Sequence, residues 1–74
     1  MDQIEGILIF AQESRFQVLD RNGVAHHFIL HHSAAAEPEQ LPGLQRQQAR
    51  VRVGYRKAPD LIAHAATSIR VLEA

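Results

Sequence analysis

Apolar and polar residues alternate, or apolar residues cluster, along five stretches of the chain, and each stretch predicts a β-strand. Residues 4–10 (IEGILIF) are apolar and rich in β-branched side chains, with Gly6 inside the run. A glycine within a strand often marks a bulge or a sharp bend, so we expect the first strand to bend at Gly6. Residues 15–19 (RFQVL) and 24–30 (VAHHFIL) predict the second and third strands.

A turn sequence separates the second and third predicted strands. Residues 20–23 read DRNG, and Asn22-Gly23 supplies the positive φ values that short hairpin turns need. We therefore expect a hairpin whose second arm carries HHFILHH, residues 26–32. Alternation along that arm gives an expected core face and an opposite face. The core face holds Val24, His26, Phe28 and Leu30, and the opposite face holds Ala25, His27, Ile29 and His31.

The second half of the chain predicts a loop and two more strands. Residues 33–48 contain Pro38, Pro42 and Gly43, so we expect a loop with at most a turn or two of helix. Residues 49–57 (ARVRVGYRK) alternate between apolar and basic side chains, which is typical of a half-buried strand. Residues 61–72 (LIAHAATSIRVL) predict the last strand, irregular around positions 65 and 66. In the fourth strand Val51, Val53 and Tyr55 point one way and Arg50, Arg52 and Arg56 form an outer basic row, while Ile69 and Val71 resume the alternation in the last strand. We expect Phe28, Leu30, Val51 and Val53 to lie in the core.

This order of elements predicts an all-β fold. Five strands, a bent first strand, a tight hairpin and a long connection before the fourth strand favour a five-stranded antiparallel, OB-fold-like small barrel. An SH3-like barrel is the alternative. Closure of the sheet would also remove the exposed edges that a short all-β chain otherwise has. We expect residues 1–74 to form a single domain.

Composition narrows the setting of the protein. The chain has no cysteine, which excludes disulfides and thiolate metal sites and favours a cytoplasmic location. It shows neither a signal-peptide pattern nor an apolar run long enough to span a membrane. The net charge is zero, but residues 1–40 hold six acidic and two basic side chains, whereas residues 41–74 hold six basic and two acidic ones. That asymmetry predicts a polarised surface that could face a charged partner.

The histidines of HHFILHH raise the question of a metal site. On a helix, His27 and His31 would lie one turn apart and could chelate a metal ion. On a strand they lie roughly 13 Å apart, at about 3.3 Å per residue, and adjacent histidines point to opposite faces. We therefore expect surface or half-buried histidines, no metal and no other cofactor. Ser33 and Ser68 lack the context of a catalytic motif, so we expect a protein that is not an enzyme.

Several motifs of the chain resemble those of the bacterial cold-shock domain. FILHHSA, residues 28–34, is similar to that family's second nucleic-acid-binding motif, V-F-V-H-F-S-A. GILIFAQESRFQVLDRNG, residues 6–23, resembles the family's opening, a glycine followed by K-W-F, K-G-F-G-F-I and a D-G turn. LQRQQARVRV and AHAATSIRVL resemble the start of the family's fourth strand and its ending. The resemblance spans about residues 6–72 and implies an OB-fold that binds single-stranded RNA and DNA.

The resemblance also implies a set of binding residues. Phe10 falls on the family's tryptophan, Phe16 on its first phenylalanine and His31 on its histidine, while Val18, Ile29 and His32 replace further aromatic residues. Plain alternation instead turns Phe16 and Val18 inward. Arg56 and Lys57 lead into the loop between the last two strands, which borders the ligand face of an OB-fold. The nucleic-acid-binding set implied by the resemblance and by this loop is Phe10, Phe16, Val18, Ile29, His31, His32, Arg56 and Lys57.

Two functions remain open at this point. The first is weak binding of single-stranded RNA or DNA with little sequence preference, through stacking on aromatic rings beside cationic side chains. The second is a protein-interaction or structural barrel that has lost nucleic-acid binding. In that case the surface around Val18, Leu19 and Ile29 would contact a protein partner or form a homodimer.

Overall fold

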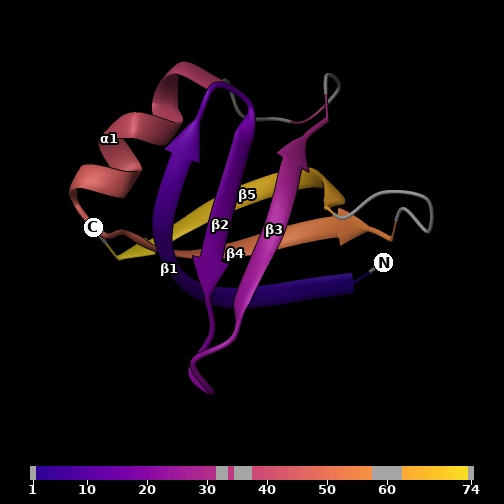
Figure 1. Ribbon diagram of the computed structural model, residues 1–74, viewed down its shortest axis with the longest axis horizontal. Helices are drawn as coiled ribbons and strands as arrows, with labels where there is room; N and C mark the ends of the chain where they lie inside the picture. Colours follow the sequence, from indigo (N-terminus) through magenta and orange to yellow (C-terminus); the bar gives the residue numbers. More distant parts are fainter. Residues whose placement is uncertain (1, 32–33, 35–37, 58–62, 74) are drawn as a thin grey trace.

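The computed structural model describes residues 2–31, 34, 38–57 and 63–73. The described part contains five β-strands, one 3-10 turn and one short α-helix (Figure 1). Their bounds are β1 Asp2–Gln12, β2 Arg15–Leu19, β3 Ala25–Leu30, η1 Pro38–Gln40, α1 Leu41–Arg46, β4 Arg50–Arg56 and β5 His64–Glu73. The expected strands are therefore confirmed in order, and the predicted loop contains the expected short helix.

The five strands form one sheet that closes in a ring, in the order β1-β2-β3-β5-β4. In Figure 1, β1, β2 and β3 lie side by side, and β4 and β5 cross behind them. Four of the pairings are antiparallel, but β3 pairs with β5 in parallel over three residue pairs, from Phe28 with His64 to Leu30 with Ala66. The expectation of a wholly antiparallel sheet is thus wrong. The long connection between β3 and β4 allows β5 to lie beside β3 and run in the same direction. The alternation of apolar and polar residues within single strands does not reveal this.

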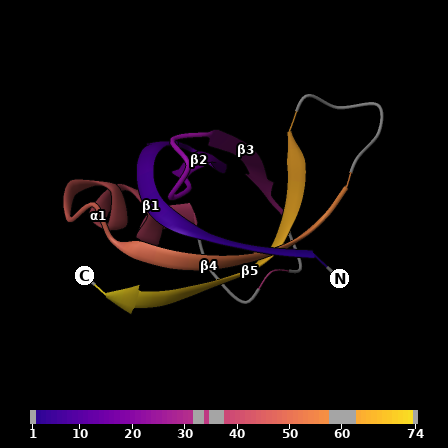
Figure 2. The ribbon, with the colours of Figure 1, turned by 90° about the horizontal axis from the view of Figure 1, so that it is seen from below.

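β1 closes the ring because it pairs with two strands in succession. Residues Asp2 to Ile7 pair with β4, and Ile7 to Gln12 pair with β2. The strand curves between these two halves, as Figures 1 and 2 show. A Cβ atom at Gly6 would overlap the Leu19 carbonyl oxygen and lie 2.8 Å from a Val18 methyl group. Only glycine permits this close approach, so the predicted bend at Gly6 is confirmed.

The core lies inside the ring. Its buried side chains are Leu8, Phe16, Val18, Phe28, Leu30, Leu41, Ala49, Val51, Val53 and Ala66. The expected burial of Phe28, Leu30, Val51 and Val53 is confirmed. Val24, expected on the core face, is instead 51% exposed because it precedes β3 and belongs to the hairpin turn. Leu41 brings α1 into the core beside β1.

No helix in the described residues is long and apolar enough to cross a membrane.

Candidate functional site

The outer face of β1, β2 and β3 is built from three cross-strand rows of side chains. The register places Phe10 beside Gln17 and Gln17 beside His27. We call these three residues the Phe10 row. On one side of it lie Gln12, Arg15 and Ile29, and on the other lie Ile7, Leu19 and Ala25. Neighbours along such rows have Cβ atoms about 4.5–5.5 Å apart, so each row is one continuous strip of surface.

Phe10 reaches this face because of an irregularity in β1. Leu8 is buried, and simple alternation would turn Phe10 inward as well. The register of β1 against β2 shifts between Leu8 and Phe10, which reverses the parity of the strand. As a result Phe10 is 38% exposed, and the following Ala11 packs against the core. The outward position expected for Phe10 from the family resemblance is therefore the position it occupies.

Phe16 and Val18 do not belong to the outer face. Their exposures are 1% and 0%, and Phe16 stacks on Phe28 with ring centroids 5.2 Å apart. A ring buried in the core cannot stack on a nucleotide base. The outward placement of these two residues is thus wrong, and the inward placement given by alternation is correct. Gln17, between them, is the β2 residue that faces outward.

The remaining predicted residues lie near the end of β3 and the end of β4. Ile29 is half-buried on the outer face, beside Arg15 on one side and Ala65 on the other. His31 is half-buried, and its backbone N–H donates to the Ala66 carbonyl oxygen over 2.8 Å. Arg56 ends β4 and is exposed, as is Lys57 after it. His32 lies outside the described residues.

Two of the arginines on β4 are paired with acidic side chains from distant parts of the chain. Arg52 donates to Glu5 Oε1 from Nε over 2.8 Å, and the Arg52 guanidinium lowers the pKa of Glu5. Arg50 Nη1 lies 3.8 Å from Glu73 Oε1. Two of the three outer arginines of β4, Arg50 and Arg52, therefore each lie beside an acidic side chain. Glu5 and Arg52 come from opposite halves of the sequence, so folding reduces the charge polarity that the sequence predicts.

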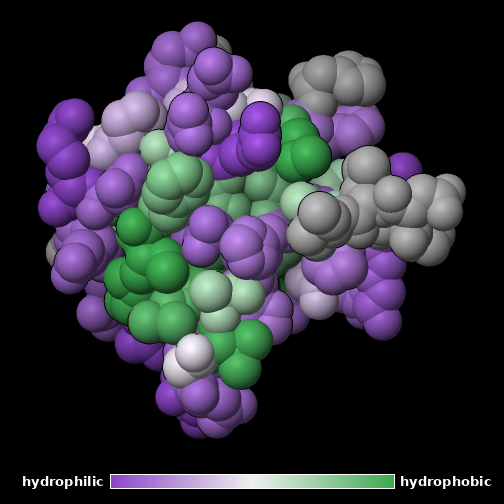
Figure 3. Space-filling view, in the orientation of Figure 1, coloured by the Kyte–Doolittle hydropathy of each residue, from purple (hydrophilic) through white to green (hydrophobic). Residues whose placement is uncertain are grey.

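His27, Gln17 and Arg15 are outer-face residues that the motif comparison missed. His27 is exposed and completes the Phe10 row, and exposed Arg15 begins the neighbouring row. The signal for His27 was present in the alternation, which already placed it on the face opposite Phe28. Figure 3 shows this face as green apolar surface over β1 and the hairpin end, interrupted by purple polar groups.

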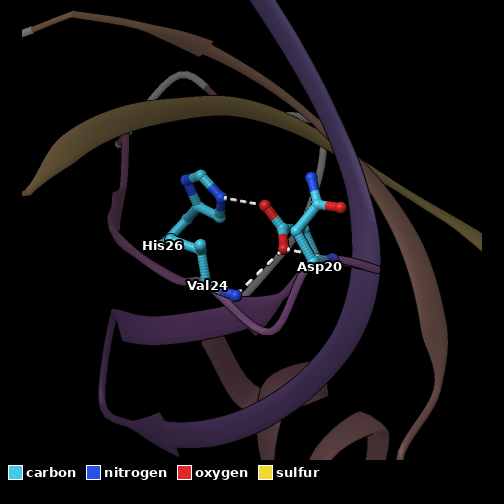
Figure 4. Close-up of polar contacts among 4 residues, drawn as sticks. Asp20, Val24 and His26 are labelled. Atoms are coloured by element: carbon cyan, nitrogen blue, oxygen red, sulfur yellow. Dashed lines mark hydrogen bonds and ion pairs between the residues drawn. The ribbon is translucent and has the colours of Figure 1, made fainter.

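Asp20 organises the hairpin between β2 and β3 (Figure 4). Its Oδ1 accepts the backbone N–H groups of Asn22 and Val24, and its Oδ2 lies 2.8 Å from His26 Nε2. The hydrogen bond with His26, followed by that with Val24, holds the pKa of the Asp20 carboxyl below its usual range. Gly23 has a φ of 81°, the conformation that glycine adopts without strain. The predicted turn at residues 20–23 is therefore confirmed, but of the pair Asn22-Gly23 only Gly23 has the expected positive φ.

His64 belongs to an aromatic cluster at one end of the core. Its ring stacks on Tyr55 with centroids 5.1 Å apart, and it lies 6.5 Å from the ring of Phe28. His64 Nδ1 is buried and makes no hydrogen bond within the described part of the chain. Over the same residues, no three histidine, cysteine or acidic side chains gather in a way that could hold a metal ion.

Comparison with known proteins indicates neither a family nor a function for the chain. No family model matches the chain, and no curated protein or solved structure matches it either. The resemblance to cold-shock domains therefore rests on the sequence motifs, and the candidate site rests on the geometry of the outer face.

Proposed function

We propose that the chain is an OB-fold module that binds single-stranded nucleic acid weakly. Three features support the fold: the strand order β1-β2-β3-β5-β4, the parallel β3–β5 pairing, and the short helix between β3 and β4. OB-folds use the face of their second and third strands, and the loops beside it, to bind oligonucleotides. In this chain the corresponding face carries the Phe10 row.

The Phe10 row is the observation that carries the binding proposal. Phe10 and His27 are exposed rings on the same face, separated by one strand, or roughly 10 Å at the usual spacing of strands. Stacking of a base on such a ring contributes about 1–3 kcal/mol and tolerates any base. The Gln17 amide between the rings can donate to and accept from a base edge.

Cationic side chains beside the row supply the electrostatic part of the interaction. Arg15 lies in the next row, and Arg56 and Lys57 extend the cationic surface from the end of β4. Within the described residues Arg15 has no acidic partner, in contrast to Arg52 with Glu5. Contacts of this kind release counterions from the strand, so affinity falls steeply with salt. With two stacking rings and few cations, we expect weak binding with little sequence preference.

The test is an NMR titration of the labelled protein with oligo-dT and oligo-U at low salt. We expect the largest shift changes at Phe10, Arg15, Gln17 and His27. Phe10→Ala should weaken binding roughly 5- to 150-fold, the equivalent of one lost base stack. Val24→Ala is the matched control, because Val24 is exposed but lies outside the row. Absence of shifts at low salt, or shifts confined to Arg50 and Arg52, would contradict the proposal.

A protein contact is the second candidate function, and it has an observation of its own. The row Ile7, Leu19 and Ala25 is wholly apolar, and exposed Val24 lies next to it at the hairpin. Such a strip suits a protein partner better than a nucleotide backbone. If the titration gives no shifts, while Leu19→Ser abolishes binding to a protein partner, this candidate becomes the better one.

A further inference from the structure

The C-terminal half of β5 has an edge that no described strand covers. β5 pairs with β3 only from His64 to Ala66, whereas it pairs with β4 as far as Glu73. Figure 2 shows this part of β5 at the margin of the molecule, with β4 along one side. Within the described residues, positions 67–73 make no backbone hydrogen bonds beyond those with β4. An edge of this kind is a template for another strand.

A groove with a mixed polar and apolar lining lies beside the open edge. It has a volume of about 340 Å³ and is lined by Gln40, Gly43, Leu44, Gln47 and Val71. Val71 is 46% exposed, although its cross-strand neighbour Val51 is fully buried. Val51 and Val71 both point to the inner side of the sheet. Val71 is nevertheless exposed because, at its position along β5, no described strand pairs with β5 on the side opposite β4. A strand added to β5 would cover it.

The charges on this edge are of both signs and lie on one face. Arg70 pairs across the strands with Arg52, and Glu73 pairs with Arg50. A register shift between these pairs brings Arg70 and Glu73 to the same outer face, although they are three residues apart. Arg52 is neutralised by Glu5, but Arg70 has no acidic partner within the described residues. Glu73 is 74% exposed and lies 3.8 Å from Arg50.

We propose that the occupant of this edge is a second copy of the same chain, paired antiparallel through β5. A two-fold axis near Leu72 places Arg70 of each copy across from Glu73 of the other. The edge is thus complementary to itself, as the symmetric interface of a dimer requires. The added strand completes the open backbone hydrogen bonds and covers Val71. A strand with a single sign of charge would satisfy only Arg70 or Glu73.

The size of the contact sets the strength of the dimer. One short strand pair with a single groove is at the small end of specific interfaces, so dimers should form only at high protein concentration. The surface lies apart from the Phe10 row, which is on β1, β2 and β3. The dimer and the nucleic-acid face can therefore be tested separately.

Sedimentation equilibrium at protein concentrations from about 10 µM to about 1 mM tests the proposal. A small interface is expected to have a dissociation constant within this range. The wild-type chain should shift from monomer toward dimer. Arg70→Glu sets two like-charged pairs across the axis and should weaken dimerisation at least about tenfold. The double variant R70E/E73R restores opposite charges and should return the dissociation constant to within about threefold of wild type. Arg21→Glu is the matched control, since it makes the same charge change at the exposed hairpin turn.

Three results would each overturn the proposal. The first is a wild-type chain that stays monomeric throughout the range, which would leave the edge to a different partner. The second is an Arg70→Glu variant that dimerises as well as Arg21→Glu. The third is a double variant that folds, as judged by circular dichroism, but does not regain dimerisation.

Discussion

Phe28 is a buried core residue whose ring contacts those of Phe16, Tyr55 and His64. The centroid of its ring lies 5.2 Å from that of Phe16 and 5.3 Å from that of Tyr55. The Phe28 side chain is 1% exposed. Phe28→Ala should lower the free energy of unfolding by roughly 3–5 kcal/mol, because it removes buried surface and leaves a cavity. Urea unfolding measures this change. Phe10→Ala is the control of the same chemistry on the outer face, and an equal loss in both variants would contradict the assignment of faces.

Single residues show which side-chain positions could be predicted from the sequence and which could not. The core positions Phe28, Val51 and Val53 followed from alternation, because large apolar side chains on one side of a strand must be buried together. Phe16 and Val18 show that alternation was a better guide than motif similarity. The outward turn of Phe10 depends on a register shift against β2, which a single strand's sequence does not encode.

The hairpin between β2 and β3 is the element with the clearest electrostatic design. His26 and the turn backbone stabilise the Asp20 carboxylate and lower its pKa below the usual 3.8. The carboxylate therefore contributes stability that is fully present above about pH 4 and is lost as the pH falls through the lowered pKa. Asp20→Asn keeps a side-chain acceptor but removes this titration.

Thermal unfolding between about pH 2 and pH 6 should therefore depend less on pH for Asp20→Asn than for the wild type. Glu5→Gln provides a comparison, since the Arg52 guanidinium lowers the pKa of Glu5 in the same direction. Equal pH dependence of the wild type and Asp20→Asn would show that the hairpin does not contribute to acid stability.

Elements were predicted more completely than their arrangement. The turn at residues 20–23, the strands and the short helix all follow from local signals such as Asn-Gly and the two prolines. The parallel pairing of β3 with β5 joins Phe28 to His64 across 36 positions, and nothing local specifies its direction. The open edge of β5 follows from the same pairing, so the sequence did not reveal it either.

At the scale of the whole molecule, the described residues His26, His27 and His64 lie in three different environments. His27 faces outward, His26 contacts Asp20, and His64 stacks on Tyr55. Stoichiometric zinc should therefore leave the melting temperature nearly unchanged. A site occupied at about 100 times its dissociation constant would add about 2.7 kcal/mol to the stability, so differential scanning fluorimetry would detect it. A shift of that size would reject this distribution of histidines.

The double role of β1 sets the order in which the molecule can assemble. The second half of β1 pairs with β2, which follows a few residues later in the sequence. The first half pairs with the distant β4, and this requires a long loop to close, because Glu5 and Arg52 are 47 residues apart. The hairpins can form in microseconds, but folds dominated by distant pairings complete in milliseconds to seconds. We therefore expect residues 2–6 to join the native structure late. During that delay the newly made chain exposes both the edge of β4 and the inner side of the sheet to other chains.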